Sequence, residues 1–162
     1  MALNKTFITM QMHIADRRYE QYKLYIHADQ LVYEAMSAMG FNVNQYCIGG
    51  SVALIAYNVD INRTPHDVDV VVPKEFANII SHFVSCDKFN RFKFKPNSSS
   101  HSSYSFQYKD IVIDILEEDE INVYDVVQRN CRLNYLEDIM KIKEKWLRPK
   151  DLDDLAAICR IY

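Results

Sequence analysis

The segment His66-Asp67-Val68-Asp69-Val70-Val71-Val72 decides the fold, because it alternates acidic and apolar residues before it becomes wholly apolar. Alternate side chains of a strand point to opposite faces, so Asp67 and Asp69 share one face. The other face carries valines, which predicts a strand buried on that side and ended by Pro73. The acidic face therefore holds two carboxylates side by side.

A third acidic residue strengthens the hypothesis that this pair belongs to a functional site. Asp114 interrupts the apolar strand predicted over residues 110–116, where a lone carboxylate is costly unless something compensates it. Carboxylates that lie close together repel each other and favour a hard divalent cation, Mg²⁺ or Mn²⁺, between them. Asp67, Asp69 and Asp114 are therefore candidate metal ligands and catalytic residues for phosphoryl or nucleotidyl transfer. Two simpler interpretations stay open: a solvated acid pair at a strand edge, and an Asp114 that ends the buried part of its strand or caps a neighbouring helix.

Gly49, Gly50 and Ser51 stand between an apolar strand predicted over 46–48 and a short helix predicted over 51–58. Backbone amides at such a turn, together with the positive end of the helix, suit a phosphate group. Neither GxxxxGK[ST] nor GxGxxG occurs, so a P-loop or a Rossmann dinucleotide site is not supported. Arg63 is a further candidate phosphate contact, with a solvated loop residue as the alternative.

The remaining sequence alternates between helical and extended patterns. Apolar spacing predicts a long amphipathic helix over 15–39, stopped by Gly40, and shorter helices over 74–84, 136–146 and 149–161. Period-two segments at 91–95 and 103–108 predict a hairpin. This order predicts an α/β (α+β) fold: a small mixed sheet flanked by helices, with a long N-terminal helix and a C-terminal helical tail.

Composition sets the broad class. The 162 residues, 49% hydrophobic and 25% charged, predict one globular domain over 1–162 with its core at about 46–116. The net charge of −3 gives no general case for a nucleic-acid partner, although Arg91, Lys93 and Lys95 form a candidate basic patch. No apolar stretch approaches the roughly 20 residues of a membrane helix, and no signal peptide is recognised. We therefore expect a cytoplasmic protein with no membrane partner.

Three segments together resemble the DNA polymerase beta-like nucleotidyltransferase superfamily. They are Gly49-Gly50-Ser51-Val52-Ala53-Leu54, then Arg63-Thr64-Pro65-His66-Asp67-Val68-Asp69-Val70, then Ile111-Val112-Ile113-Asp114. The superfamily has, in this order, a Gly-Ser turn, a short helix, a strand with two acids and a third acid on a later strand. The C-terminal segment 141–155 looks like the helical tail of the small branch that includes abortive-infection and toxin-type nucleotidyltransferases.

The resemblance implies a Mg²⁺-dependent (or Mn²⁺-dependent) enzyme that moves an NMP from an NTP to a hydroxyl acceptor and releases pyrophosphate. It implies that Asp67 and Asp69 coordinate both ions, and that Asp114 binds the catalytic ion and helps to activate the acceptor. It assigns nucleotide binding to the remaining candidates, which are Gly49, Gly50, Ser51, Arg63, Lys143 and Lys150. The acceptor is left open as a small molecule, a protein or an RNA end.

Two other functions stay open. A catalytically silent protein with the same fold would act as a partner-binding module of antitoxin type, since a complete carboxylate set does not guarantee turnover. A metal-dependent phosphohydrolase would use the same acids but release phosphate or free nucleotide. The long helix over 15–39 and the 12% aromatic content also suggest a homo-oligomer or a small helical protein partner.

Overall fold

Two parallel strands, β2 (Val68–Pro73) and β5 (Ile111–Glu118), form the centre of a mixed sheet. The structure is a computed structural model that describes residues 2–85, 93–95 and 104–162. Across the described residues the sheet order is β3-β4-β5-β2-β1-β7-β6. The outer strands are β3 (Lys93–Lys95), β4 (Tyr104–Tyr108), β1 (Cys47–Ile48), β7 (Leu133–Asn134) and β6 (Val123–Tyr124). Strands β1 and β7 are also parallel, and the other neighbours are antiparallel, so the predicted mixed sheet is confirmed.

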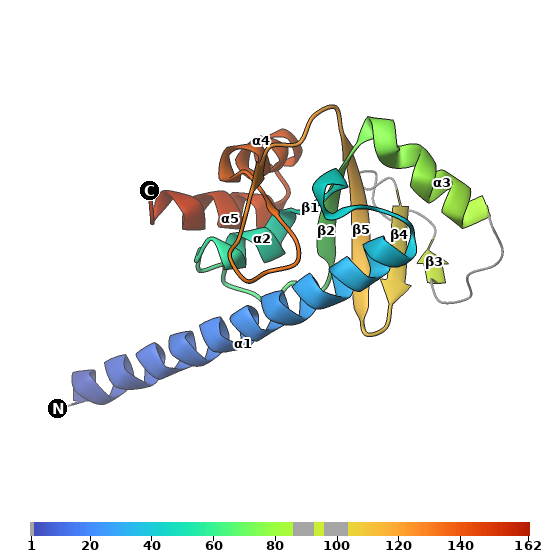
Figure 1. Cartoon of the computed structure of the whole chain (residues 1–162). Helices are drawn as coiled ribbons and strands as arrows, with labels where there is room; N and C mark the ends of the chain where they lie inside the picture. Colours follow the sequence, from blue (N-terminus) through green and yellow to red (C-terminus); the bar gives the residue numbers. More distant parts are fainter. Residues whose placement is uncertain (1, 86–92, 96–103) are drawn as a thin grey trace.

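Helices cover this sheet, as the sequence predicts. The long helix α1 (Ala2–Ala38) crosses it, and its N-terminal part extends beyond the rest of the molecule (Figure 1). The others are α2 (Gly50–Ala56), α3 (Ala77–Ser85), α4 (Leu136–Trp146) and α5 (Pro149–Cys159), with 3₁₀ turns at Val43–Gln45 and Lys74–Phe76. None of the helices in the described ranges is both long and apolar enough to cross a membrane.

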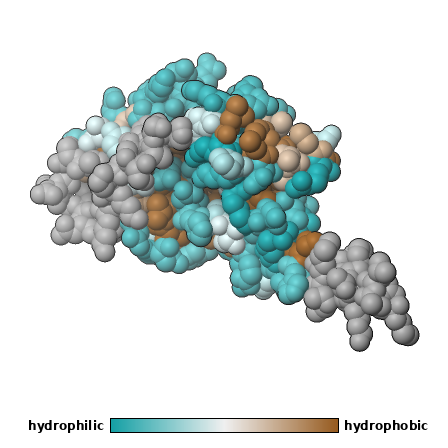
Figure 2. Space-filling view, turned by 180° about the vertical axis from the view of Figure 1, so that it is seen from behind, coloured by the Kyte–Doolittle hydropathy of each residue, from teal (hydrophilic) through white to brown (hydrophobic). Residues whose placement is uncertain are grey.

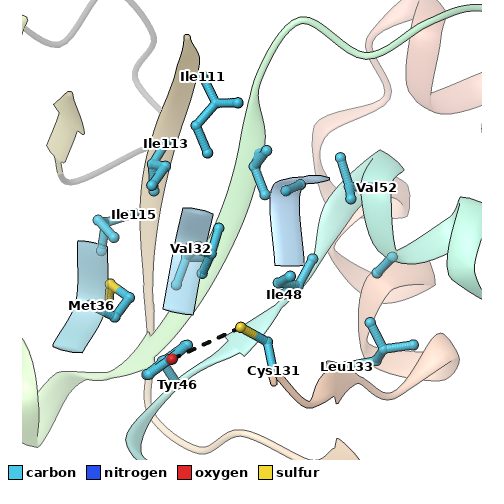
Figure 3. Close-up of a cluster of buried hydrophobic side chains, with 14 of the residues drawn as sticks. Val32, Met36, Tyr46, Ile48, Val52, Ile111, Ile113, Ile115, Cys131 and Leu133 are labelled. Atoms are coloured by element: carbon cyan, nitrogen blue, oxygen red, sulfur yellow. Dashed lines mark hydrogen bonds between the residues drawn. The ribbon is translucent and has the colours of Figure 1, made fainter. Parts of the chain in front are cut away.

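The main hydrophobic core lies on the valine face of β2. Its side chains come from the sheet, from α1 and from α2, and they include Val32, Met36, Ile48, Val52 and Ile113 (Figure 3). All of these are fully buried or nearly so. The period-two prediction for residues 66–72 is therefore confirmed, because the alternate valines enter this core while the acids face the other way.

The opposite face of the sheet carries a smaller apolar cluster. Cys47, Val71 and Leu116 are buried there, and Trp146 at the end of α4 packs against them. Helix α4 therefore covers only part of this face. The first residues of β2 lie beside the helix rather than under it. Seen from behind, the surface of the molecule is mostly hydrophilic, with apolar side chains gathered in small separate patches (Figure 2).

Several element boundaries differ from the sequence prediction. Helix α1 begins at Ala2 rather than near residue 15, and the helix expected from residue 74 opens as a 3₁₀ turn before α3. Strands β6 and β7 were not predicted, because two residues each are too few to show a period. The predicted hairpin is present as the antiparallel pair of β3 and β4. Its Arg91 and the 96–102 connection lie outside the described residues.

The core makes a direct stability prediction. Ile113 is fully buried, whereas Ile161 is 49% exposed. We expect Ile113→Ala to lower the free energy of unfolding by roughly 2–5 kcal/mol, because it removes buried methyl groups and leaves a cavity. The matched change Ile161→Ala should cost no more than about 0.5 kcal/mol. Urea titration followed by circular dichroism measures both, and equal losses would contradict the placement of the core.

Candidate functional site

The central pair of strands brings two of the predicted carboxylates into direct register. Asp69 on β2 is the partner of Asp114 on the parallel neighbour β5. Side chains at paired positions of adjacent strands lie on the same face of the sheet. Asp67 stands two residues before Asp69, and its charge acts on both of the other acids. The three acids predicted to form one site are therefore neighbours on the face opposite the main core.

Hydrogen bonds connect the third acid to its surroundings. The Asp114 carboxyl bonds to Ser105, which stands directly opposite it on β4, and to the carboxyl of Asp67. Both contacts bear on the Asp114 carboxyl: the hydroxyl of Ser105 lowers its pKa and the neighbouring Asp67 raises it.

Burial and mutual repulsion perturb the acidity of this group. Desolvation, followed by the charges of Asp67 and Asp114, raises the pKa of Asp69 from its ordinary value to about 7. Desolvation also raises the pKa of Asp114, and the bond from Ser105 only partly offsets this. The ammonium groups of Lys143 and Lys150 act in the opposite direction on Asp69. The acids therefore lie in a site where added positive charge would be strongly favourable.

The turn at Gly49 and Gly50 packs directly against Asp69. Gly49 is the residue before α2, and its backbone N–H donates to the Asp69 carbonyl oxygen at 2.9 Å. Gly50 follows with φ of +56°, and a Cβ atom at this position would collide with the Asp69 carboxylate. Glycine is therefore required at Gly50 both by backbone conformation and by space. The turn between β1 and α2 therefore fits closely against the Asp69 carboxylate.

A second group of charged side chains lies behind the glycine turn and is largely buried. The guanidinium of Arg63 forms a two-pronged ion pair with Asp154 and donates to Ser51 Oγ at 2.6 Å. Asp154 is fully buried and also pairs with Lys143 Nζ at 2.7 Å. Burial alone would raise the pKa of Asp154, but the Arg63 bond and the Lys143 charge hold it below its usual value. These ion pairs and hydrogen bonds hold the Ser51 side chain in one position beside the glycine turn.

The network continues into the start of α5. Lys143 is 4% exposed and lies 3.4 Å from Asp151, whose carboxylate also accepts the Arg148 Nε–H at 2.7 Å. Three cations, Arg63, Lys143 and Arg148, therefore surround two buried carboxylates and leave one net positive charge behind the acidic triad. The Arg148 guanidinium also lies over the Trp146 ring at 4.7 Å. A narrow pocket joins this cationic side to Gly50 and Asp69.

The predicted nucleotide-binding residues thus fall into two groups. Gly49, Gly50 and Ser51 line or adjoin the acidic site, and Lys150 is exposed with its charge acting on Asp69 and Asp114. Arg63 and Lys143 instead have carboxylate partners in the buried network. Their predicted direct contact with a nucleotide stays a prediction, and the structure gives each of them a second role in holding Ser51 and α5.

Three charged residues of the C-terminal segment 141–155, Lys143, Asp151 and Asp154, are buried rather than solvated. The two acids are three residues apart on α5, which places them on one helix face. Asp151 itself follows Arg148 by three residues. The regular spacing of Arg148, Asp151 and Asp154 is therefore the feature of the sequence that indicates an ion network. Nothing in the sequence pointed to Ser105 as a partner of Asp114.

The donor set of the triad suits a hard cation, because it offers carboxylate oxygens in a site of excess negative charge. Across the described ranges, however, no three His, Cys, Asp or Glu side chains already converge in the geometry of a metal site. The three carboxylates lie on one face of the sheet, so they would need to turn toward a common ion to bind it.

Comparison with solved structures identifies the same fold elsewhere. The chain is similar to the antibiotic-resistance factor ANT(2'')-Ia in its solution structure, at 16% identity and a TM-score of 0.54 over 81% of this chain and 83% of that one. ANT(2'')-Ia is a nucleotidyltransferase of the polymerase beta-like superfamily. A crystal structure of ANT(2'')-Ia with adenylyl-2''-tobramycin also matches, at 13% identity and a TM-score of 0.47 over 85% of this chain and 98% of that one. No protein-family model and no curated protein sequence matches the chain.

The first of these likenesses shows the fold. The α/β architecture with a mixed sheet, a long N-terminal helix and a C-terminal helical segment is the nucleotidyltransferase fold expected from the sequence. Membership of the small toxin-type branch stays a prediction.

The glycine turn yields a controlled prediction. Gly50 and Gly40 both have positive φ, but only Gly50 faces an obstacle, since nothing lies within 4 Å of a Cβ at Gly40. We expect Gly40→Ala to cost about 1–2 kcal/mol of unfolding free energy from backbone strain alone. Gly50→Ala should cost more, because Asp69 must also move. Thermal and urea unfolding compare the two, and equal costs would show that Gly50 does not press against the acid.

Asp69 predicts a specific pH dependence. A carboxyl with a folded-state pKa near 7 and an ordinary unfolded value is less favourable when ionised in the folded protein. Asp69 therefore lowers stability as the pH rises from about 4 to 7, and the full loss persists above pH 7. Asp69→Asn should raise the free energy of unfolding at pH 8 and flatten this part of the pH profile. The exposed control Asp125→Asn should leave the profile unchanged, and the same profile in both variants would contradict the assignment.

Proposed function

We propose that this protein is a Mg²⁺-dependent nucleotidyltransferase that moves an NMP from an NTP to a hydroxyl acceptor and releases pyrophosphate. The observation that carries this proposal is the in-register pair of Asp69 and Asp114, with Asp67 beside them and Gly50 against Asp69. Such a cluster needs cations, and a magnesium-bound triphosphate brings them. The acceptor, a small molecule, a protein or an RNA end, is not assigned.

Asp67, Asp69 and Asp114 would hold the magnesium ions, which would offset the charge of the triphosphate and lower the pKa of the acceptor hydroxyl. Gly49, Gly50 and Ser51 would contact the phosphates, with Ser51 held in place by Arg63 and Asp154. Lys150, exposed and close enough to influence two of the acids, would neutralise a phosphate from the open side.

The chemistry needs one proton acceptor. The acceptor oxygen attacks the α-phosphorus, the bond between this phosphorus and the bridging oxygen to the β-phosphorus breaks, and pyrophosphate leaves. The carboxylate of Asp114 would accept the hydroxyl proton. Ser105 holds the Asp114 carboxyl in one orientation through its hydrogen bond.

One observation favours the second candidate, a catalytically silent partner-binding protein. The N-terminal part of α1 extends beyond the body of the molecule (Figure 1), and Tyr19 and Tyr22 on this helix are 63% and 50% exposed. An exposed aromatic stripe on a helix is a surface for a small helical partner or a second copy. Co-purification of a stoichiometric partner, with no transfer from any NTP, would support this function instead.

The first test is calorimetric titration of ATP, GTP, CTP and UTP with Mg²⁺. We expect binding that requires both the metal and the acids, so the variant Asp67→Asn/Asp69→Asn should lose it. Transfer of labelled NMP should then fall roughly a hundredfold or more, because the phosphates lose their counter-charge. The control variant Asp125→Asn makes the same chemical change at an exposed aspartate and should keep full activity.

Loss of fold can be separated from loss of chemistry. Relief of the repulsion at Asp69 should make the double variant at least as stable as the natural protein at pH 8. A stable but inactive variant would therefore place the defect in the site. Full transfer by the double variant would refute the proposal, and release of phosphate or free nucleotide without a labelled acceptor would identify a phosphohydrolase.

A further inference from the structure

One buried carboxylate joins four segments of the chain beside the acidic site. Asp154 on α5 is fully buried, and three side chains from elsewhere in the fold converge on it. Its carboxylate accepts from Arg63 Nη2 at 2.7 Å and from Ser51 Oγ at 3.3 Å. Lys143 Nζ lies 2.7 Å from it. These partners come from the loop before β2, from α2 and from α4, so Asp154 ties α5 to three other segments.

Arg63 is held at both ends. Its guanidinium forms the two-pronged pair with Asp154 and also donates to Ser51 Oγ at 2.6 Å. Its backbone carbonyl accepts from Gln21 Nε2 at 2.7 Å, and the same nitrogen donates to the carbonyl of Ile61 at 2.7 Å. Gln21 lies on α1 and is 2% exposed. Movement of the guanidinium toward a ligand would break these bonds and take a partner from a buried carboxylate, which is costly.

The partners of Arg63 lead directly to a proposed metal ligand. Ser51 follows Gly50, and a Cβ atom at Gly50 would lie 1.8 Å from a carboxylate oxygen of Asp69. In such close packing, a shift of this turn changes the surroundings of the Asp69 carboxylate. The Ser51 hydroxyl is fixed on both sides, since it donates to Asp154 and accepts from Arg63.

The same carboxylate anchors the helix that carries Lys150. Asp154 and Lys150 are four residues apart on α5, so they lie on one face of the helix, about one turn apart. Lys150 is exposed, and its charge acts on Asp69 and Asp114. The buried anchor therefore sets the position of the exposed ammonium group relative to the acids.

We propose that Asp154 is a positioning residue of the transfer site, and that Arg63 acts through Asp154 and Ser51 rather than by touching the phosphates. This role differs from the direct nucleotide contact that the family resemblance implies for Arg63. It rests on the proposed function, because the position of these groups matters to the chemistry only if Mg²⁺ and phosphates bind beside them.

The test is a double-mutant cycle, read by calorimetric titration of the full chain with inorganic tripolyphosphate and Mg²⁺. This probe carries the phosphates of an NTP without a base. The variants are Arg63→Lys, Asp154→Asn and the two combined. Lysine keeps the positive charge but loses the two-pronged geometry, so the variant separates charge at a phosphate from geometry at Asp154.

We expect Arg63→Lys and Asp154→Asn each to weaken tripolyphosphate binding roughly tenfold, and the combination to be no weaker than Asp154→Asn alone. Removal of the Asp154 charge would by itself strengthen the binding of an anion, so a loss of affinity reports on position. Tighter or unchanged binding by Asp154→Asn would overturn the proposal. So would a loss from Arg63→Lys that persists in full in the Asp154→Asn background, since Arg63 would then touch the phosphates directly.

A matched control separates positioning from stability. Arg17 Nη2 bonds both oxygens of Asp60 in the same loop, and the Arg17 side chain is 28% exposed, against 29% for Arg63. We expect Arg17→Lys to change tripolyphosphate affinity by less than about twofold, because it does not reach Ser51 or Asp154. Equal losses in Arg17→Lys and Arg63→Lys would overturn the proposal.

Urea titration first establishes that each variant is folded under the conditions of the calorimetry. Ser51→Ala removes no charge, and it closes a second cycle with Arg63→Lys if Asp154→Asn does not fold. Non-additive losses are expected there as well, and additive losses would overturn the proposal. Failure of the natural chain to bind tripolyphosphate with Mg²⁺ would refute the proposed function itself. Binding that is lost in Asp67→Asn/Asp69→Asn but additive in the cycle would refute only the positioning role.

Discussion

The repulsion between carboxylates on adjacent parallel strands is the constraint on which the rest of the structure depends. Asp69 and Asp114 occupy paired positions, so neither can move away without changing the register of the central strands. That register is fixed from the other face, where the valines of β2 and Ile113 of β5 enter the main core. Hydrophobic burial on one side of the sheet therefore enforces an unfavourable arrangement of charge on the other, as is typical of functional sites.

The chain meets this constraint with positive charge placed in two layers. Lys150 acts from solvent, whereas Lys143 acts from within the protein and is itself held by Asp151 and Asp154. A buried lysine without a partner would destabilise the fold, and these two carboxylates supply the opposite charge. The same Asp154 fixes Arg63, and the electrostatic support of the site is thereby joined to the position of Ser51.

Local patterns predicted the parts of this protein that repeat over several residues. The alternation around Asp67 and Asp69, and the apolar spacing that gives α4, both survive in the structure because burial selects them directly. Pairings across long distances left no such pattern. The link between Arg63 and Asp154 spans 91 residues, and Ser105 meets Asp114 only through the register of β4 and β5. Strands β6 and β7 depend on their neighbours rather than on their own sequence.

The span of the ion network also bears on the order in which the protein matures. A chain emerges from the ribosome N-terminal end first, at roughly 5–20 residues per second. The acids of β2 and the turn at Gly50 leave the ribosome long before Asp154, which closes the network from α5. Until then Arg63 and Ser51 lack the partner that holds them. A nascent chain thus exposes its acidic residues while their supporting frame is missing, and the finished geometry is acquired only after α5 has been synthesised.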